Sequence, residues 1–259
     1  MITFSRMGKH GRLGNQMFQY ATLYSVAKKN NYEFGIPFKQ KSESSYFNLQ
    51  IDECFPNLSA KDSSNIESKN TYLETSFKYD DSIFSIEDNT NICGNFQSEK
   101  YFKNYKQDIK QEFEFCDRVL EQTQSILSKF MEPPIALHIR MGDYKISGGK
   151  HPICNIDYYK NALQEVPDSS PLFVFSDEPN SVKEHLKNLN RSYKIYTDTT
   201  AEQDLCLMVH CDYHIIANSS FSWWGAWLSN SKKVIAPYQW FGDRSFDWSY
   251  IYCENWSVI

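Results

Sequence analysis

The stretch PPIALHIRMGDY, residues 133–144, decides how the second half of this chain folds. Its apolar run, Ile135–Ile139, predicts a strand, and Gly142 predicts the turn that ends the strand. The two prolines before the run stop any preceding helix, so the strand begins a new structural segment. A histidine, an arginine and an aspartate therefore stand where a rigid strand ends.

Strands and helices are expected to alternate from this point onward. The expected order is strand 135–139, helix 156–166, strand 172–175, helix 179–188, strand 193–196, helix 201–210, strand 214–217, helix 221–228 and strand 234–236. Such alternation predicts a parallel sheet with helices on both faces. Ligands of these sheets bind at the carboxyl ends of the strands, so His138, Arg140 and Asp143 lie where a ligand would bind.

The first half of the chain carries a less regular pattern. We expect a strand at 1–4, a glycine turn at 8–14, a helix at 16–30, a strand at 32–36, polar serine-rich loops and short elements at 40–70, a strand at 92–96, and a largely helical segment at 101–130 with a break near Cys116. The helix-breaking prolines then divide the chain into two expected domains, 1–132 and 133–259.

Composition excludes several classes of protein. The net charge of −5 does not fit a basic nucleic-acid-binding surface, so no nucleic-acid partner is expected. The seven cysteines are odd in number and scattered, without a CxxC pair, which excludes a disulfide framework and a structural zinc site and suits a reducing cytoplasm. The N-terminus has no apolar signal region, and no run of about 18 apolar residues predicts a transmembrane segment.

The stretch GRLGNQMFQYA, residues 11–21, is the first candidate for chemistry. Gly11 and Gly14 flank Arg12 at an expected strand-to-helix junction, where backbone amides and a helix N-terminus can approach a polar or anionic ligand. A plain tight turn with a solvated arginine is the alternative. The glycine spacing differs from the GxGxxG fingerprint of dinucleotide-binding folds.

In HIRMGDY, the guanidinium of Arg140 can hold two phosphate oxygens at once. Strand alternation puts His138 and Arg140 on one side and Met141 on the other. The alternative for Arg140 is a structural ion pair with Asp143. FSDE, residues 175–178, repeats the arrangement one strand later, although its serine and aspartate would equally suit a helix N-cap.

The richest stretch runs from Asp204, on an expected helix, to the tryptophans of the next helix. Asn218 ends a strand, and Ser219, Ser220 and Phe221 begin a helix, where hydroxyls and free backbone N–H groups form a phosphate cradle. Trp223, Trp224 and Trp227 are interpreted as core. The histidines His10, His185, His210 and His214 are interpreted as surface or core residues. No metal-ligand spacing and no motif for covalent catalysis is present, so neither a metal nor a cofactor is expected.

Together, GRLGNQMFQYA, HIRMGDY, FVFSDE and NSSFSWWGAWL resemble the bacterial α-1,2-fucosyltransferases of glycosyltransferase family 11, in order and spacing over almost the whole chain. The resemblance implies an α/β, glycosyltransferase-B-like architecture of two Rossmann-like domains whose parallel sheets face across a cleft. The N-terminal domain would hold the acceptor and the C-terminal domain the nucleotide sugar.

The implied reaction is an inverting, metal-independent transfer of fucose from GDP-fucose to the 2-hydroxyl of a galactose-ended glycan, without a cofactor. The acceptor would be an oligosaccharide or a lipid-linked glycan of cell-surface polysaccharide biosynthesis, and residues 40–100 are expected to shape its site. The enzyme would be cytoplasmic, with peripheral binding to the inner face of the membrane as an alternative. The competing functions are a transferase for another GDP-sugar and a non-catalytic carbohydrate-binding protein.

The resemblance also implies roles for single residues. Arg140 would contact the diphosphate, His138 the nucleotide and Asp204 the guanine; Ser219, Ser220 and Phe221 would cradle a phosphate; and Arg12 and Asn15 would lie near the fucose and diphosphate. Arg140, Asp143 and Arg12 form the expected catalytic set. Asp143 is preferred to His151 as the general base, and the alternatives are an unnamed residue or a dissociative mechanism without a strong base. Met141 departs from the family, which usually has arginine at this position.

Overall fold

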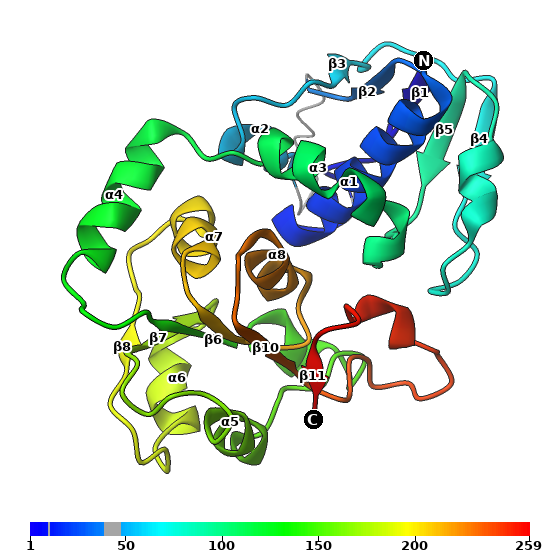
Figure 1. Cartoon of the computed structure of the whole chain (residues 1–259). Helices are drawn as coiled ribbons and strands as arrows, with labels where there is room; N and C mark the ends of the chain where they lie inside the picture. Colours follow the sequence, from blue (N-terminus) through cyan, green and yellow to red (C-terminus); the bar gives the residue numbers. More distant parts are fainter. Residues whose placement is uncertain (10, 39–47) are drawn as a thin grey trace. The chain divides into compact units, whose positions relative to one another are not determined.

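The computed structural model of the chain describes residues 1–9, 11–38 and 48–259 (Figure 1). Two compact units are present, one of Met1–Cys116 with Asp247–Cys253 and the other of Asp117–Phe246 with Glu254–Ile259. His10 and residues 39–47, part of the segments expected to hold a glycine turn and polar loops, lie outside the described residues.

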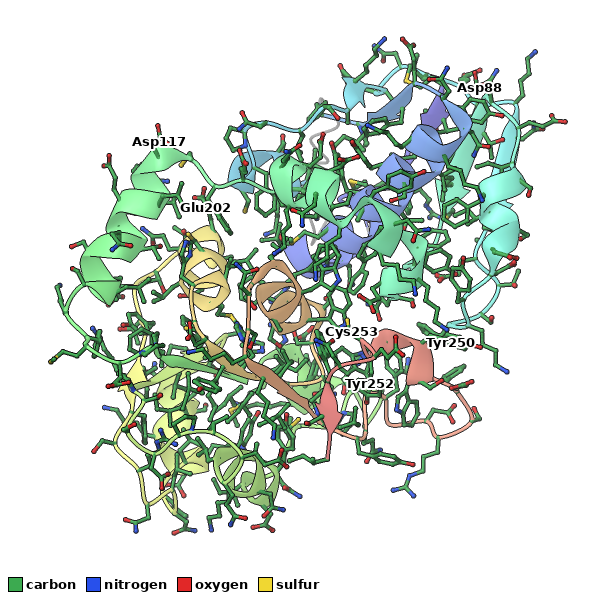
Figure 2. All side chains as sticks on the ribbon, in the orientation of Figure 1. Asp88, Asp117, Glu202, Tyr250, Tyr252 and Cys253 are labelled. Carbon is green, nitrogen blue, oxygen red and sulfur yellow. The ribbon has the colours of Figure 1, made fainter. Side chains whose placement is uncertain are left out.

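The division between the units differs from the boundary expected at 132/133. Helix α4 (Asp117–Leu127) packs on α7 (Ala201–Val209), so it belongs to the second unit. Arg118 near the start of α4 pairs with Glu202 on α7 at 3.3 Å. Figure 2 labels Glu202 and Asp117, the first residue of α4. Residues 247–253 belong to the first unit, where the Nζ of Lys100 lies 4.5 Å from the centre of the Tyr250 ring.

The first unit contains a parallel five-stranded sheet in the order β3-β2-β1-β5-β4. The strands are β1 (Ile2–Thr3), β2 (Phe34–Ile36), β3 (Lys61–Asp62), β4 (Asn70–Leu73) and β5 (Thr90–Cys93). The helices are α1 (Leu13–Asn30), α2 (Ile51–Cys54) and α3 (Lys106–Glu112), with 3₁₀ turns at η1 (Asp81–Ser85), η2 (Glu99–Tyr101) and η3 (Lys103–Tyr105). The connection from β1 through α1 runs to β2, while β5 lies on the other side of β1, so the winding reverses between β1 and β5.

Sequence patterns found the apolar elements of this unit and missed the polar ones. The predicted helix at 16–30 is present and starts earlier, at Leu13, because the side chain of Gln50 accepts the N–H of Leu13 at 2.8 Å and caps the helix from outside. The predicted break near Cys116 separates α3 from α4. Strands β3 and β4 are short and largely exposed, so they show no apolar alternation that could have been read.

The second unit contains a parallel six-stranded sheet in the order β11-β10-β9-β6-β7-β8. The strands are β6 (Ile135–Ile139), β7 (Leu172–Ser176), β8 (Lys194–Ile195), β9 (Tyr213–Ile215), β10 (Lys233–Ala236) and β11 (Ser257–Val258). The helices between them are α5 (Ile156–Leu163), α6 (Pro179–His185), α7 and α8 (Ser220–Leu228), with η4 (Asp143–Ile146) after β6; η5 (Ser249–Ile251) belongs to the first unit. This is the doubly wound order, and its winding reverses between β6 and β9, where such sheets bind ligands at the carboxyl ends.

Helices cover both faces of this sheet, α7 and α8 on one and α5 and α6 on the other (Figure 1). Alternate residues of β6 enter different cores: Leu137 and Ile139 pack with residues of α5 and α6, and Ala136 packs with residues of α7. Trp223 and Trp224 of α8 are fully buried, so the predicted core role of the tryptophans is confirmed. In the part of the chain that the structure describes, no helix is long and apolar enough to cross a membrane.

Candidate functional site

Arg140 stands at the carboxyl end of β6, held between two carboxylates. Its Nη1 lies 2.8 Å from Asp177 Oδ2, its Nη2 pairs with Asp143, and only 14% of its side chain is exposed. The guanidinium also lies over the ring of Tyr144, 5.3 Å from the ring centre. The ion pair with Asp143, considered as an alternative from the sequence, is therefore present. A guanidinium carries five N–H donors, so these two contacts leave donors for a phosphate.

Asp177 positions the turn that follows β6. Its Oδ1 accepts the backbone N–H of Met141 at 3.0 Å while its Oδ2 pairs with Arg140. A Cβ on Gly142 would lie 2.2 Å from Asp177 Oδ2, which explains the glycine at this position. The residue at the N-cap of α6 is Glu178, without a side-chain capping bond, so Asp177 serves the neighbouring strand and not the helix.

Met141 faces away from Arg140. It is 8% exposed and belongs to the core cluster that contains Leu137 and Ile139, on the α5–α6 side of the sheet. The side predicted from strand alternation is confirmed. The Met141 side chain thus points into an apolar core, on the side of β6 opposite Arg140.

His138 lies on the Arg140 side of β6 and is almost fully buried. Its ring is 5.8 Å from the ring of Phe221 at the start of α8. Burial, followed by the positive charge of Arg140, lowers the pKa of His138 to about 3, against the opposing effect of Asp177. Its Nδ1 is buried without a hydrogen-bond partner among the described residues. The imidazole is therefore neutral near pH 7 and can accept or donate one hydrogen bond, but it cannot serve as a cation.

Helix α8 begins shortly after the carboxyl end of β9, the strand that lies beside β6. Ser219 is the N-cap residue, and its side chain makes no capping bond. The N–H groups of a first helical turn have no intrahelical partners, and together with the helix dipole they attract anions. Ser219 is buried, whereas Ser220 and Phe221 are partly exposed. The role of Ser219, Ser220 and Phe221 as a phosphate cradle stays a prediction.

Tyr144 connects the two halves of this site. Its hydroxyl donates to the backbone oxygen of Asn218 at 2.8 Å, directly before the α8 start, and its ring lies under the guanidinium of Arg140. The same ring is stacked on His151, with 4.8 Å between ring centres. Tyr144 was not among the predicted site residues, although its position within HIRMGDY was the available signal.

The two candidates for a general base lie beside this stack. Asp143 has 45% of its side chain exposed, and its ion pair with Arg140 uses Oδ1. His151 is half-buried against Tyr144 and Phe241, and burial lowers its pKa, opposed by the charge of Asp143. Both side chains are therefore near Arg140, and Asp143 is the more accessible.

Asp204 lies in the first turn of α7, and α7 covers the same face of the sheet as α8 (Figure 1). It accepts a hydrogen bond from the Thr199 hydroxyl at 2.6 Å. Burial raises the pKa of Asp204 to about 6, against the lowering effect of Thr199. A partly desolvated carboxylate of this kind suits a ligand with N–H donors.

In the first unit, Arg12 and Asn15 lie at the start of α1, beyond the carboxyl end of β1. Arg12 is exposed, and among the described residues it has no ion pair or hydrogen-bonded side-chain partner. Asn15 accepts a hydrogen bond from Gln97 at 2.9 Å. Gly11 has a φ of +86°, and a Cβ there would lie 2.5 Å from the Asn15 amide, so the glycine makes room for Asn15. The side-chain oxygen of Gln16 accepts the backbone N–H of Gln50 at 2.8 Å, which joins the start of α1 to the segment before α2.

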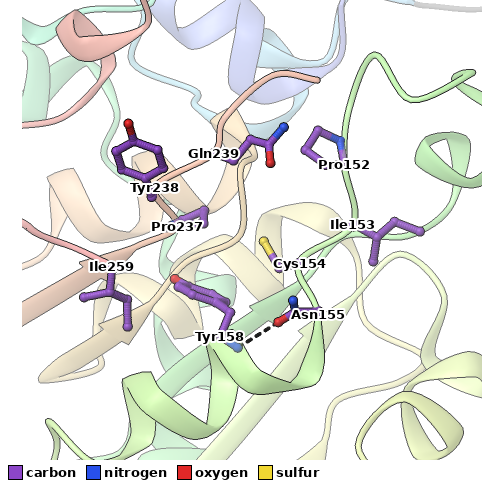
Figure 3. Close-up of a pocket in the computed structure, with 9 residues that line it drawn as sticks. All are labelled: Pro152, Ile153, Cys154, Asn155, Tyr158, Pro237, Tyr238, Gln239 and Ile259. Carbon is purple, nitrogen blue, oxygen red and sulfur yellow. Dashed lines mark hydrogen bonds between the residues drawn. The ribbon is translucent and has the colours of Figure 1, made fainter. Parts of the chain in front are cut away.

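A small pocket lies at the carboxyl ends of β10 and β11 (Figure 3). Its volume is about 210 Å³, and it is lined by Pro152, Ile153, Cys154, Asn155, Tyr158, Pro237, Tyr238, Gln239 and Ile259. Whole small molecules usually need roughly 300–1,000 Å³, so the pocket holds at most part of one. None of the site residues predicted from the sequence lines it.

The described residues contain no group of three or more His, Cys, Asp or Glu side chains that could hold a metal ion. Residues 4–259 match the sequence profile of Glycosyl transferase family 11.

The chain belongs to glycosyltransferase family 11.

Relatives of this family 11 chain include enzymes with two different transferred sugars in their names. An alpha-1,2-colitosyltransferase of Escherichia coli is 30% identical over 89% of this chain and 90% of that protein. The O-antigen biosynthesis glycosyltransferase WbnK of Escherichia coli is 26% identical over 91% of this chain and 94% of that protein. The galactoside alpha-(1,2)-fucosyltransferase 2 of Gorilla gorilla gorilla is 27% identical over 86% of this chain and 68% of that protein.

Solved structures with the same fold include two that were determined with GDP-fucose. POFUT1 in complex with GDP-fucose has a TM-score of 0.56 and 13% identity, covering 91% of this chain and 97% of that one. NodZ alpha-1,6-fucosyltransferase soaked with GDP-fucose has a TM-score of 0.55 and 12% identity, covering 88% and 92%. The predicted glycosyltransferase-B-like α/β architecture with two parallel sheets is confirmed, and the chain is a glycosyltransferase.

Proposed function

We propose that this family 11 glycosyltransferase transfers fucose from GDP-fucose to the 2-hydroxyl of a galactose-ended glycan, with inversion and without a metal ion. The observation that carries the proposal is the meeting of Arg140 with the start of α8 through Tyr144. A fixed guanidinium and a helix N-terminus are both preorganised for negative charge, and such groups stabilise charge that grows in a transition state.

In the proposed reaction, an acceptor hydroxyl oxygen forms a bond to the anomeric carbon of fucose as the bond from that carbon to the diphosphate oxygen breaks. The departing electron pair leaves with GDP, whose diphosphate would lie against Arg140 and the Ser219–Ser220 turn. The hydroxyl proton would go to Asp143, which is accessible and has a carboxylate oxygen outside its ion pair. His151 is the second candidate for this proton.

Recognition of the nucleotide would divide between two further side chains. Asp204 would accept hydrogen bonds from guanine, because its carboxylate is partly desolvated and a hydrogen-bonded guanine would replace lost water. His138 would contact the nucleotide as a neutral ring. In the first unit, Arg12 and Asn15 would contact the fucose or the diphosphate.

A GDP-activated colitose is a second candidate donor. It is favoured by the relative named as a colitosyltransferase, whose identity to this chain is 30%, against 27% for the fucosyltransferase of Gorilla gorilla gorilla. Product assays with labelled GDP-fucose and GDP-colitose, on galactose-ended acceptors, discriminate between the donors.

A melting experiment tests the nucleotide assignment. We expect GDP, without added metal, to stabilise the protein by about 2.7 kcal/mol at a hundredfold excess over its dissociation constant. For a chain of this size that corresponds to a shift of about 5–10 °C. UDP is the matched control. Equal stabilisation by UDP, or stabilisation by GDP only when manganese is added, would contradict the proposal.

A further inference from the structure

The turn after β5 is held rigidly at the end of the strand. The carboxylate of Glu74 accepts the backbone N–H of Asn95 at 2.6 Å and that of Phe96 at 3.0 Å. Phe96 has a φ of +51°, in the left-handed region that bulky residues rarely adopt, and its ring is buried. Strained backbone of this kind persists only where the surroundings enforce it, and it is often found at functional sites.

This turn presents Gln97 to α1. The Nε2 of Gln97 donates to Asn15 Oδ1 at 2.9 Å, while its own Oε1 is buried without a hydrogen-bond partner among the described residues. One helical turn beyond Asn15, Gln19 donates to the backbone oxygen of Gly94 at 3.1 Å, and its Oε1 is a second buried acceptor without a partner in the described chain. Buried polar atoms are normally satisfied, so within the described part of the chain this amide cluster lacks two hydrogen-bond partners.

The chemistry of the pair indicates what would complete it. The bond between Asn15 and Gln97 uses Asn15 Oδ1 and Gln97 Nε2, and Gln97 Oε1 is a buried acceptor without a partner among the described residues. The other amide atom of Asn15, Nδ2, is a hydrogen-bond donor. A hydroxyl group can donate to Gln97 Oε1 and accept from Asn15 Nδ2. Phosphate and carboxylate oxygens lack a proton for Gln97 Oε1, so they fit less well.

The position of the pair is that of a ligand site. Asn15 follows β1 and Gln97 follows β5, and the winding of the first sheet reverses between these two strands. Ligands bind at the carboxyl ends of strands where the winding reverses. Gln97 was not singled out from the sequence, because a single glutamine in a polar turn carries no pattern.

We propose that Asn15 and Gln97 bind one hydroxyl of a sugar substrate, and that Gln97 is a specificity-determining residue for it. The inference rests on the proposed glycosyl transfer, in which both the donor and the acceptor carry sugar hydroxyls. The hydroxyl belongs either to the transferred sugar or to the acceptor, and the experiment separates these sources.

The test is the variant Gln97→Met, which keeps the length of the side chain and removes the acceptor. Turnover is measured with the parent donor and acceptor and with analogues of each that lack one hydroxyl other than the reacting one. The wild type should prefer the parent over one such analogue by about 10- to 100-fold in kcat/KM, and Gln97→Met should reduce this preference to less than about threefold. The substrate that carries this hydroxyl identifies the source.

Two further variants serve as a control and as a second test. Gln107→Met is the matched control, since Gln107 is exposed on α3 of the same unit. Asn15→Asp keeps the oxygen that accepts the bond from Gln97 but removes the Nδ2 donor. It should therefore reduce the preference for the parent substrate over the deoxy analogue, even if Gln97→Met folds poorly. If both variants keep the wild-type preferences against every deoxy analogue, the amides bind only water and the proposal is wrong.

A binding measurement separates this outcome from failure of the proposed function. If the wild type transfers no fucose, calorimetry compares GDP-fucose with GDP, and a methyl galactoside with buffer, for wild type and Gln97→Met. Weaker binding of one sugar ligand by the variant, with GDP affinity unchanged, supports the hydroxyl site independently of turnover. Equal binding of both sugar ligands by both proteins refutes it.

Discussion

Removing Arg140 should damage both folding and turnover, and a second substitution should separate the two effects. The pair of Arg140 with Asp177 has side chains only 14% and 16% exposed. Breaking a fully buried pair costs about 3–5 kcal/mol, and breaking an exposed one about 0.2–1 kcal/mol. We therefore expect Arg140→Ala to lower the free energy of unfolding by about 2–3 kcal/mol, because the carboxylate of Asp177 is left without its cation.

The double variant Arg140→Ala/Asp177→Asn removes this unpaired charge. An asparagine oxygen can still accept the backbone N–H of Met141, which Asp177 accepts at 3.0 Å in the native protein. The double variant should thus regain about 1 kcal/mol or more of the lost stability. Turnover should be about a hundredfold to a thousandfold below that of the wild type in both variants, because neither has the guanidinium that would face the diphosphate.

Urea unfolding followed by tryptophan fluorescence, together with kcat on GDP-fucose, measures both effects. Arg140→Lys is the matched variant that keeps the charge, and it should recover turnover only in part, since an ammonium cannot grip two oxygens at once. Turnover close to wild type in the double variant would refute the reasoning. Arg140 would then be a structural partner of Asp177, and its loss would act only through the misplaced turn.

Four further outcomes are expected. Met141→Arg should lower the melting temperature and change GDP affinity by less than about threefold, because the side chain points into the core opposite Arg140. Calorimetry measures the affinity, and Met141→Leu is the control. A gain in GDP affinity of tenfold or more would contradict this expectation. GDP affinity should fall about tenfold as the pH drops through about 6, because Asp204 then gains a proton and becomes a weaker hydrogen-bond acceptor. In calorimetric titrations, the variant Asp204→Asn should show no such dependence on pH. The stability contribution of Asp204 has the opposite direction: the native state binds this proton more tightly than the unfolded chain, so the contribution is full below the usual aspartate pKa and is lost as the pH rises through about 6. Tyr144→Phe should lower kcat about tenfold and the melting temperature by about 2–4 °C, because it removes the bond to the oxygen of buried Asn218 but keeps the ring under Arg140. An unchanged kcat would show that this bond has no role in positioning.

Several features of the site could be predicted because they depend on neighbouring residues alone. The sides of β6 taken by Arg140 and Met141 follow from strand alternation, and the buried tryptophans follow from the apolar character of α8. The sequence pattern places the start of α1 too late, at Gln16, because its cap comes from Gln50, a residue distant in the sequence. The boundary expected at the prolines differs from the observed division because α4 packs on α7, which no local pattern indicates.

The sequence by itself determined the alternation of strands and helices in the second half, the position of HIRMGDY at a strand end, and the family. These depend on residue order, turn chemistry and periodicity, which are local properties. Only the tertiary structure decided that Asp177 holds the turn beside Arg140, through a bond to Met141, which lies 36 positions earlier in the chain. It also decided that Gln97 contacts Asn15, which lies 82 positions earlier. Such pairs form because strand order brings the carboxyl ends of particular strands together, and strand order arises from packing of the whole sheet, not from any single segment.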